Sequence, residues 1–227
     1  MPYADRREAG RTLAESLHHL VGRAGLLVLG LPRGGVPVAY EVARALDAPL
    51  DVLIVRKLGH PHHPEYAIGA IASGGVRVMN PEAGLGLRPR DIERVADAER
   101  AELDRRERLY RGDTPGLVLH DRPVVIVDDG LATGATMRAA VQAVRQQQPA
   151  WICVAVPVGA PGSCAGLEAD ADEVVCPARP IPFRAVGFWY REFPQTQDDE
   201  VRSLLAASRQ AHAPPTREPF DATLLRS

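Results

Sequence analysis

The chain has 227 residues, of which 45% are hydrophobic, and its formal net charge is -2; this length and apolar content suit one domain with a buried core and short appendages. The near-neutral charge provides no basic field for nucleic acid, and no apolar run reaches the roughly 20 residues that cross a bilayer. Because the N-terminus lacks the apolar stretch of a signal peptide and the three cysteines follow neither a zinc nor a disulfide pattern, we expect a cytoplasmic protein with no nucleic-acid or membrane partner.

The N-terminal residues 5–21 are predicted to form a helix. Asp5 and Glu8 have the spacing of a capping box, with aspartate in place of serine or threonine. Leucines at helical spacing form an apolar stripe at positions 13, 17 and 20. Packing against the core is the simpler role for this helix, and a part in a lid over a ligand is the alternative.

A buried strand is predicted at residues 26–29, followed by a glycine-rich loop and a helix over residues 36–46. The loop contains Arg33, Gly34 and Gly35. A glycine pair allows backbone conformations that turn N–H groups toward a ligand, and a guanidinium group matches phosphate oxygens. The loop is therefore a candidate anion site, although an ordinary tight turn with a solvated arginine would have the same composition.

The next predicted strand, residues 51–55, ends in the cations Arg56 and Lys57. Residues 58–66 then break all periodicity, and their prolines and glycine predict a flexible loop. The histidines of this loop lack the spacing of metal ligands on a helix face, so we expect a solvated loop and no metal site there. Glu65 is a candidate proton acceptor.

The middle of the chain is predicted to contain a β-hairpin and one long helix. Residues 66–72 and 76–79 flank a Ser-Gly-Gly turn, which is typical of a hairpin. Residues 89–111 combine many arginines and glutamates with a few apolar positions. This composition indicates a solvent-exposed helix stabilised by ion pairs between neighbouring turns.

The most informative stretch is residues 124–136. Four β-branched residues predict a strand buried on both faces, Asp128 and Asp129 end it, and a loop of small residues and threonines leads into a helix over residues 137–144. Ligands bind beyond the carboxyl ends of strands in open α/β sheets, and the N–H groups at a helix N-terminus favour phosphate. Two carboxylates beside such a site suit a ligand with hydroxyl groups, a divalent cation, or both. A phosphorylated sugar bound with Mg²⁺ satisfies all of these conditions.

The rest of the chain continues the alternation of strands and helices. Strands are predicted at residues 151–156 and 173–176, with a short helix at residues 161–167 between them. This order is typical of a parallel, doubly wound sheet. A last helix is expected over residues 198–207, and residues 208–227 are expected to form a poorly ordered tail.

Residues 183–193 form the most aromatic segment of a chain in which only 5% of residues are aromatic. Phe188, Trp189 and Tyr190 are consecutive, so they cannot all face the same side. Whichever ring faces a cleft could stack on a flat ligand. A cluster in the core or at a subunit interface explains the segment equally well.

At residues 124–136 the chain resembles the type I phosphoribosyltransferases, whose signature is four hydrophobic residues, two acids and a small-residue loop with threonine. Residues 128–137 look most like the adenine phosphoribosyltransferase version. The family transfers ribose 5-phosphate from phosphoribosyl pyrophosphate to a nitrogen nucleophile, usually a nucleobase, with Mg²⁺ as cofactor. The resemblance implies an enzyme of this kind that binds phosphoribosyl pyrophosphate and a nucleobase or amine acceptor, as a homodimer.

The resemblance also implies the fold, which is α/β with a doubly wound, mostly parallel sheet, a small hood and an inserted charged helix. We expect one domain over residues 1–207. Within it, residues 81–111 are an insertion that the adenine enzymes lack, and residues 178–195 form the hood or aromatic segment. Residues 208–227 would be a flexible tail.

Carried over position by position, the resemblance implies a role for each motif. Asp128 and Asp129 would accept the ribose hydroxyls or bind Mg²⁺ through water molecules, and Glu65 would take the proton of the incoming base. The 5-phosphate would bind to the loop Ala132, Thr133, Gly134, Ala135 and Thr136. The pyrophosphate would bind to Arg33, Gly34, Gly35 and Lys57, and the base-binding candidates are Phe188, Trp189 and Tyr190.

One departure from the family bears on the acceptor. The 6-oxopurine enzymes carry an acid at the position of Ala132, beside N7 of the base, and its absence argues against hypoxanthine or guanine as acceptor. Adenine does not follow, because residues 59–65 and the inserted segment differ from the adenine enzymes. A regulatory protein that senses phosphoribosyl pyrophosphate without turnover is the alternative function. The pair Arg56-Lys57 favours the enzyme. The sequence also shows no basic face for nucleic acid, which such a regulator usually needs.

Overall fold

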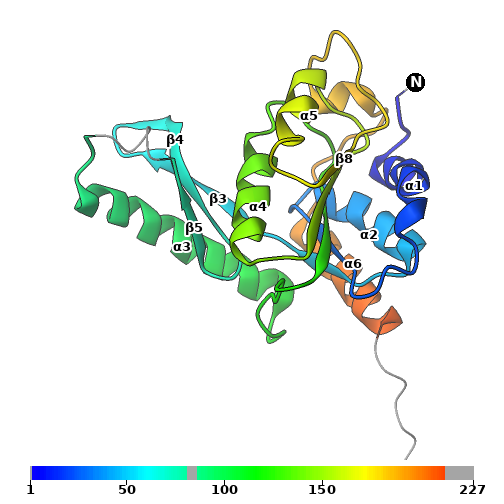
Figure 1. Ribbon diagram of the computed structural model, residues 1–227, viewed down its shortest axis with the longest axis horizontal. Helices are drawn as coiled ribbons and strands as arrows, with labels where there is room; N and C mark the ends of the chain where they lie inside the picture. Colours follow the sequence, from blue (N-terminus) through cyan, green and yellow to red (C-terminus); the bar gives the residue numbers. More distant parts are fainter. Residues whose placement is uncertain (1, 81–85, 213–227) are drawn as a thin grey trace, which may run out of the picture.

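The computed structural model describes residues 2–80 and 86–212, except for the side chains of Pro64 and Glu65. Its centre is a five-stranded sheet with the order β2-β1-β6-β7-β8, in which all neighbours are parallel (Figure 1). The strands are β1 (Leu27–Gly30), β2 (Leu50–Val52), β6 (Pro123–Val127), β7 (Trp151–Ala155) and β8 (Glu173–Val175). The expected α/β fold with a mostly parallel, doubly wound sheet is confirmed.

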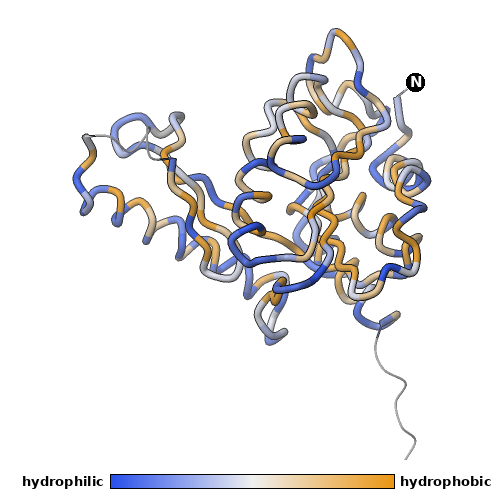
Figure 2. The backbone as a smooth tube through the Cα atoms, viewed as in Figure 1, coloured by the Kyte–Doolittle hydropathy of each residue, from blue (hydrophilic) through white to orange (hydrophobic). Residues whose placement is uncertain are grey.

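Helices cover both faces of the central sheet. One face carries Val125 and Val127 of β6 and packs against α1 (Arg6–Ser16), α2 (Gly35–Leu46) and α6 (Asp198–Ala211). The other face carries Val124 and Ile126 and packs against α4 (Ala135–Gln146) and α5 (Pro161–Leu167). Figure 2 shows hydrophobic residues concentrated along these strands. A run of β-branched residues is buried on both sides in such a sheet, as expected for parallel strands.

A second, antiparallel sheet contains β3 (Val55–His60), β4 (His63–Ala72) and β5 (Val76–Met79) in that order. The long helix α3 (Pro89–Arg111) packs on it through buried residues such as Ala96 and Leu103. Together they extend away from the central sheet as an arm (Figure 1). The hairpin of β4 and β5 and the ion-paired helix are confirmed, the latter by pairs such as Arg106–Glu102 at 2.7 Å.

The chain after β2 differs from the prediction. The strand expected over residues 51–55 is divided, because β2 ends at Val52 and β3 begins at Val55 in the other sheet. The loop expected over residues 58–66 is instead the β3–β4 hairpin. Register shifts on both sides of Gly59 hide the two-residue period of this hairpin. Cross-strand hydrogen bonds and the cover of α3 provide the order that the local sequence lacks.

The N-terminal helix begins where predicted but is shorter. The Asp5 carboxylate accepts a hydrogen bond from the Glu8 N–H at 2.8 Å, and the Glu8 carboxylate accepts one from the Ala4 N–H. This arrangement supports the capping role of both acids. The α-helix ends at Ser16, and a 3-10 turn (η1, His18–Leu20) replaces the last predicted turn.

The last helix is longer than predicted and reaches Ala211. Ser208 is buried, and its hydroxyl accepts a hydrogen bond from the Leu50 N–H at 3.1 Å, which holds α6 on the edge strand β2. Residues 208–211 therefore belong to the helix and not to a tail, whereas residues 213–227 lie outside the described part of the chain. Within the described residues, every helix is too short or too polar to cross a membrane.

Candidate active site

The candidate site lies where β1 and β6 run side by side. The chain leaves β1 through α2 toward β2 and leaves β6 through α4 toward β7, which lies in the opposite direction along the sheet. This reversal makes the carboxyl ends of β1 and β6 the switch point of the sheet, where open α/β folds bind ligands. The Leu31 N–H donates a hydrogen bond to the Val127 carbonyl at 2.9 Å, so the loops after the two strands begin in contact.

The acid pair follows β6 directly. The Asp128 carboxylate accepts a hydrogen bond from the Asp129 N–H at 2.8 Å, and Oδ2 of Asp129 lies 2.8 Å from Nε of Arg6. Burial and the neighbouring Asp129 charge raise the pKa of Asp128 well above its ordinary value. Burial also raises the pKa of Asp129, although the Arg6 guanidinium opposes that rise. The two acids therefore have different electrostatic surroundings, because Asp129 is the one that forms an ion pair with Arg6.

The glycine pair after β1 packs directly on the acid pair. A Cβ atom on Gly34 would overlap Oδ2 of Asp129, and one on Gly35 would lie 2.7 Å from the Val127 carbonyl oxygen and 3.0 Å from Oδ1 of Asp128. The φ of Gly34 is -61°, which any residue can adopt, so the close approach of the acid is what requires glycine there. The peptide bond between Pro32 and Arg33 is cis. The structure thus brings the two predicted ligand loops together.

The predicted 5-phosphate loop leads into α4, which begins at Ala135 after Gly134 in a left-handed conformation (φ 76°). Gly134 is buried, and the other loop positions are exposed, namely Ala132, Thr133, Ala135 and Thr136. The Ser163 hydroxyl of α5 donates a hydrogen bond to the Ala132 carbonyl at 2.5 Å and holds the loop. The first N–H groups of a helix lack partners within it, so this exposed end of α4 can receive an anion.

Arg33 points from the glycine loop toward α6. Its guanidinium lies 3.7 Å from Oδ1 of Asp198, the first residue of that helix. The same carboxylate oxygen accepts a hydrogen bond from the Tyr110 hydroxyl of α3 at 2.5 Å. Arg33 is therefore connected to both the inserted helix and the last helix, a connection that the sequence did not reveal.

Lys57 lies within β3, where it pairs with Ala70 of β4. It does not follow the parallel strand β2, as the sequence had suggested. It lines a cavity of about 120 Å³ together with Ala135 and Thr136 at the start of α4. The structure therefore places Lys57 beside the predicted 5-phosphate loop.

Glu65, the candidate proton acceptor, lies in β4 near the turn of the β3–β4 hairpin. Its side chain is outside the part of the structure that is described. The hairpin belongs to the arm that extends from the central sheet (Figure 1). The assignment of Glu65 as the proton acceptor stays a prediction from the sequence.

The three consecutive aromatic residues occupy three different environments. Tyr190 is buried, and its hydroxyl donates a hydrogen bond to the Asp129 carbonyl. Trp189 packs against a small apolar cluster that includes Val158. Phe188 is 67% exposed. Next to them, Val186 fills the space where a Cβ atom on Gly130 would lie, so this segment covers the acid loop directly.

Arg6 is a site residue that sequence reasoning missed. Its Nε lies 2.8 Å from Oδ2 of Asp129, a terminal nitrogen donates to the Pro194 carbonyl at 2.6 Å, and the guanidinium lies 3.8 Å above the Phe193 ring. The N-terminal segment also pairs with the aromatic segment, since the Tyr3 N–H donates to the Trp189 carbonyl at 2.8 Å. The sequence carries no local signal for Arg6, which is one of many arginines in charged helices.

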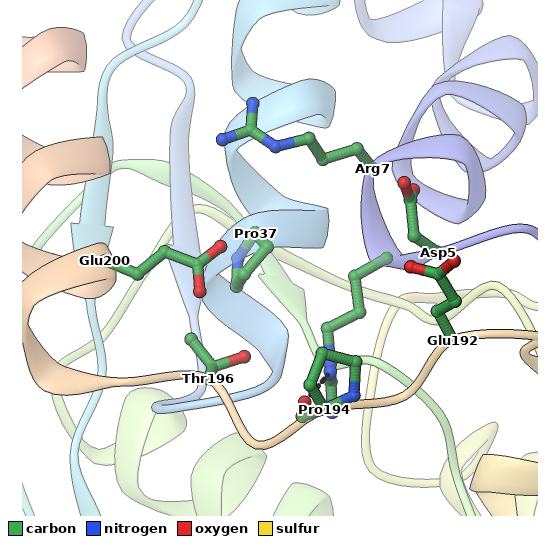
Figure 3. A pocket seen from close by; sticks show the side chains of 8 residues that line it. Asp5, Arg7, Pro37, Glu192, Pro194, Thr196 and Glu200 are labelled. Carbon is green, nitrogen blue, oxygen red and sulfur yellow. Dashed lines mark hydrogen bonds between the residues drawn. The ribbon is translucent and has the colours of Figure 1, made fainter.

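Arg6 also lines a pocket of about 220 Å³. The pocket lies between the starts of α1 and α2 and the segment before α6 (Figure 3). Arg7, Glu192 and Glu200 contribute charged groups of both signs to its wall. Arg7 lies 3.4 Å from Oε1 of Glu41 in α2. Arg6 is thus the pocket residue that also contacts the acid pair.

Comparisons with known proteins identify the family of the chain. Residues 4–191 match the family model described as phosphoribosyl transferase domain. A protein of Mycobacterium tuberculosis (strain H37Rv), provisionally named a phosphoribosyl transferase, is 50% identical to this chain over 205 residues. The match covers 89% of this chain and 46% of that protein. The chain therefore spans about half the length of this curated relative. The crystal structure of TT1426 from Thermus thermophilus is similar with a TM-score of 0.82 and 45% identity, covering 91% of this chain and 99% of that one. The resemblance seen at residues 124–136 is confirmed: the chain belongs to the phosphoribosyl transferase domain family.

Proposed function

We propose that the protein is an Mg²⁺-dependent phosphoribosyltransferase that transfers ribose 5-phosphate from phosphoribosyl pyrophosphate to a nitrogen nucleophile, namely a nucleobase, and releases pyrophosphate. One observation carries this proposal. The acids Asp128 and Asp129 lie at the switch point of the sheet, between the glycine loop after β1 and the loop that begins α4. Phosphoribosyl pyrophosphate has its ribose hydroxyls between a 5-phosphate and a pyrophosphate. Acids between two candidate anion-binding loops would match these groups in the same order.

Each part of the substrate has a group of matching chemistry in the site. The exposed start of α4, with Thr133 and Thr136, would bind the 5-phosphate, and Lys57 lies beside it. Asp129 and Asp128 would accept hydrogen bonds from the ribose hydroxyls. The backbone of the glycine loop and the Arg33 guanidinium would hold the pyrophosphate, since glycine admits a close backbone approach.

The residues present fit a magnesium ion held mainly by its substrate. Among the described residues, His, Cys, Asp and Glu side chains do not gather in groups of three or more that could hold a metal ion. The adjacent carboxylates Asp128 and Asp129 are hard oxygen donors, and Mg²⁺ in such sites keeps several waters and binds through one or two carboxylates and substrate phosphates. When bound, the ion would neutralise charge on the pyrophosphate.

The chemistry requires positioning and charge neutralisation more than it requires a protein nucleophile. The nitrogen lone pair of the acceptor attacks C1 of the ribose, the bond from C1 to the pyrophosphate oxygen breaks, and pyrophosphate leaves with the electron pair. The nitrogen then loses a proton, for which Glu65 remains the sequence-based candidate. Arg33 would stabilise charge that develops on the leaving group, and the acid pair would hold the sugar in line for attack.

The acceptor side of the site is the aromatic segment. Phe188 offers an exposed ring, whereas Tyr190 is committed to its hydrogen bond with the Asp129 carbonyl. We therefore propose Phe188 as the ring that stacks on the base. Position 132 carries alanine and not an acid, which argues against a 6-oxopurine as the acceptor.

The test is pyrophosphate release from magnesium phosphoribosyl pyrophosphate across a panel of nucleobases and amines. We expect release that depends on one acceptor and falls at least a hundredfold in Asp129→Asn. Asp121→Asn is the matched control, because the Asp121 side chain is 82% exposed and its carboxylate pairs with the neighbouring His120. Binding of the sugar without release for any acceptor would overturn the transferase in favour of a sensor.

A further inference from the structure

The contacts of Arg6 all converge on the candidate site. Its guanidinium bonds to the Asp129 carboxylate at 2.8 Å, donates to the Pro194 carbonyl at 2.6 Å and stacks on the Phe193 ring at 3.8 Å. The Arg6 side chain is 11% exposed and that of Asp129 is 15% exposed. The free energy of such a buried ion pair is favourable only if its geometry is good. Removal of one partner leaves the charge of the other buried without a counter-ion.

The Asp129 carboxylate has little freedom in this arrangement. Its Oδ2 lies between Nε of Arg6 and the backbone of Gly34, where no Cβ atom could fit. The main chain of Asp129 is also held, because the Tyr190 hydroxyl donates a hydrogen bond to its carbonyl. Arg6 is therefore the group that determines where the carboxylate points within the space that the glycine loop leaves.

We propose that Arg6 is a positioning residue, which holds the Asp129 carboxylate in the orientation that accepts the ribose hydroxyls of phosphoribosyl pyrophosphate. This inference rests on the proposed function. Arg6 acts through Asp129 and is not assigned a contact with the pyrophosphate. Its effect therefore falls on ligands that contain the ribose and spares those that contain only the leaving group.

Arginine suits this role better than lysine. The planar guanidinium bonds to the carboxylate and to the Pro194 carbonyl at the same time while its face stacks on Phe193. A lysine ammonium would keep the charge but lose the flat face and the fixed fork of donors. The conservative variant Arg6→Lys should therefore restore part of the function that Arg6→Ala loses.

The experiment is calorimetric titration of the full chain with three probes: magnesium phosphoribosyl pyrophosphate, ribose 5-phosphate and magnesium pyrophosphate. In Arg6→Ala we expect the first two to bind at least tenfold more weakly and pyrophosphate to change less than twofold. Arg6→Lys should lie between wild type and Arg6→Ala. Arg11→Ala is the matched control on the same helix and should bind all three probes as wild type does, because the Arg11 side chain is 55% exposed and its guanidinium lies 4.0 Å from Glu41 of α2.

A double-mutant cycle with Asp129→Asn tests whether Arg6 acts through the acid. We expect Arg6→Ala to weaken binding of the sugar ligands no further once Asp129 is replaced, since effects that share one route are not additive. Additive losses would overturn the inference, as would equal weakening of all three probes. If Arg6→Ala does not fold, judged by its thermal melt, Arg6→Lys carries the test with at least a threefold loss for the sugar ligands only.

The failure of this inference is distinguishable from failure of the proposed function. Wild type that binds neither phosphoribosyl pyrophosphate nor ribose 5-phosphate would overturn the proposed function and this inference with it. Wild type that binds both, with unchanged affinity in Arg6→Ala, would overturn the inference alone.

Discussion

Arg33 of the glycine loop lies 3.7 Å from Asp198 at the start of α6, and the same Asp198 oxygen accepts a hydrogen bond from Tyr110 of α3. Arg33, the residue proposed to bind pyrophosphate, therefore contacts α6 directly and is connected to α3 through Asp198. The Arg33 side chain is 31% exposed and that of Asp198 is 40% exposed, so the pair is partly screened by solvent. The Arg33 guanidinium consequently already has a carboxylate partner with which a pyrophosphate would compete.

The first prediction concerns Asp198→Asn. The amide keeps an oxygen for the Tyr110 hydroxyl but removes the charge that competes with pyrophosphate for Arg33. Because partly exposed ion pairs contribute roughly 0.2–1 kcal/mol, we expect magnesium pyrophosphate to bind up to about fivefold more tightly, measured by calorimetry. Asp199→Asn is the control, since Asp199 is 84% exposed and pairs with Arg202. Weaker or unchanged binding of magnesium pyrophosphate would show that Asp198 does not compete with this ligand for Arg33.

The second prediction concerns Gly34→Ala. The new methyl group would occupy the position of the Asp129 carboxylate, so the acid must leave its place. We expect at least a hundredfold loss of pyrophosphate release and a melting temperature several degrees lower, since overpacking costs about 1–3 kcal/mol. Gly116→Ala is the control, because a Cβ atom there meets none of the described residues within 4 Å.

A second variant separates the clash from a general loss of folding. In an Asp129→Ala background the overlapping carboxylate is gone, so adding Gly34→Ala should lower the melting temperature much less than it does in wild type, while activity stays lost. An equal fall in melting temperature in both backgrounds would contradict the close packing of Gly34 on Asp129 as the cause.

The third prediction concerns Phe188→Ala. Stacking of an aromatic ring contributes about 0.5–1.5 kcal/mol, so the KM for the acceptor base should rise about twofold to twelvefold. The KM for phosphoribosyl pyrophosphate should stay within twofold, because the acid pair and both loops are untouched. Ile181→Ala is the control, as Ile181 is 86% exposed in the same part of the chain. The measurement is steady-state kinetics with the identified acceptor. An unchanged KM for the acceptor base would refute the stacking role of Phe188.

The fourth prediction concerns alkaline pH. Burial and the hydrogen bond to Asp198 raise the pKa of Tyr110 from 10.0 to about 12. The folded state therefore holds this proton more tightly than the unfolded state, and the stability that Tyr110 contributes is present below pH 10 and is lost as the pH rises toward 12. The urea midpoint should fall less steeply over that range in Tyr110→Phe than in wild type. Tyr66→Phe, at a position that is 56% exposed, should follow the wild-type curve.

Several features could be predicted from local sequence because local physics determines them. The β-branched run before Asp128 is typical of a strand in a parallel sheet covered on both faces, and β6 is fully buried. The capping pair Asp5 and Glu8 marks the start of α1, and helical spacing with ion-paired charges predicts α3 over residues 89–111, as observed. The order of strands and helices then makes a doubly wound sheet the simplest topology.

Other features depend on which distant segments meet. At residues 53–54 the chain passes from β2 to β3 in the second sheet, and Ser208 is buried where α6 packs on the edge strand β2. Short-range patterns do not encode such partners, so the sequence predicted a continuous strand and a flexible tail at these places.

The candidate site divides in the same way. Asp128, Asp129 and the two glycine-containing loops were recognisable from the sequence by itself, because each motif is a short run whose residue types limit its backbone and its chemistry. Only the tertiary structure decided that Arg6 would bond to Asp129 across 123 positions of the chain and that Lys57 would lie beside the start of α4. An isolated arginine or lysine is compatible with many surroundings, and its partner is selected by packing of the whole fold.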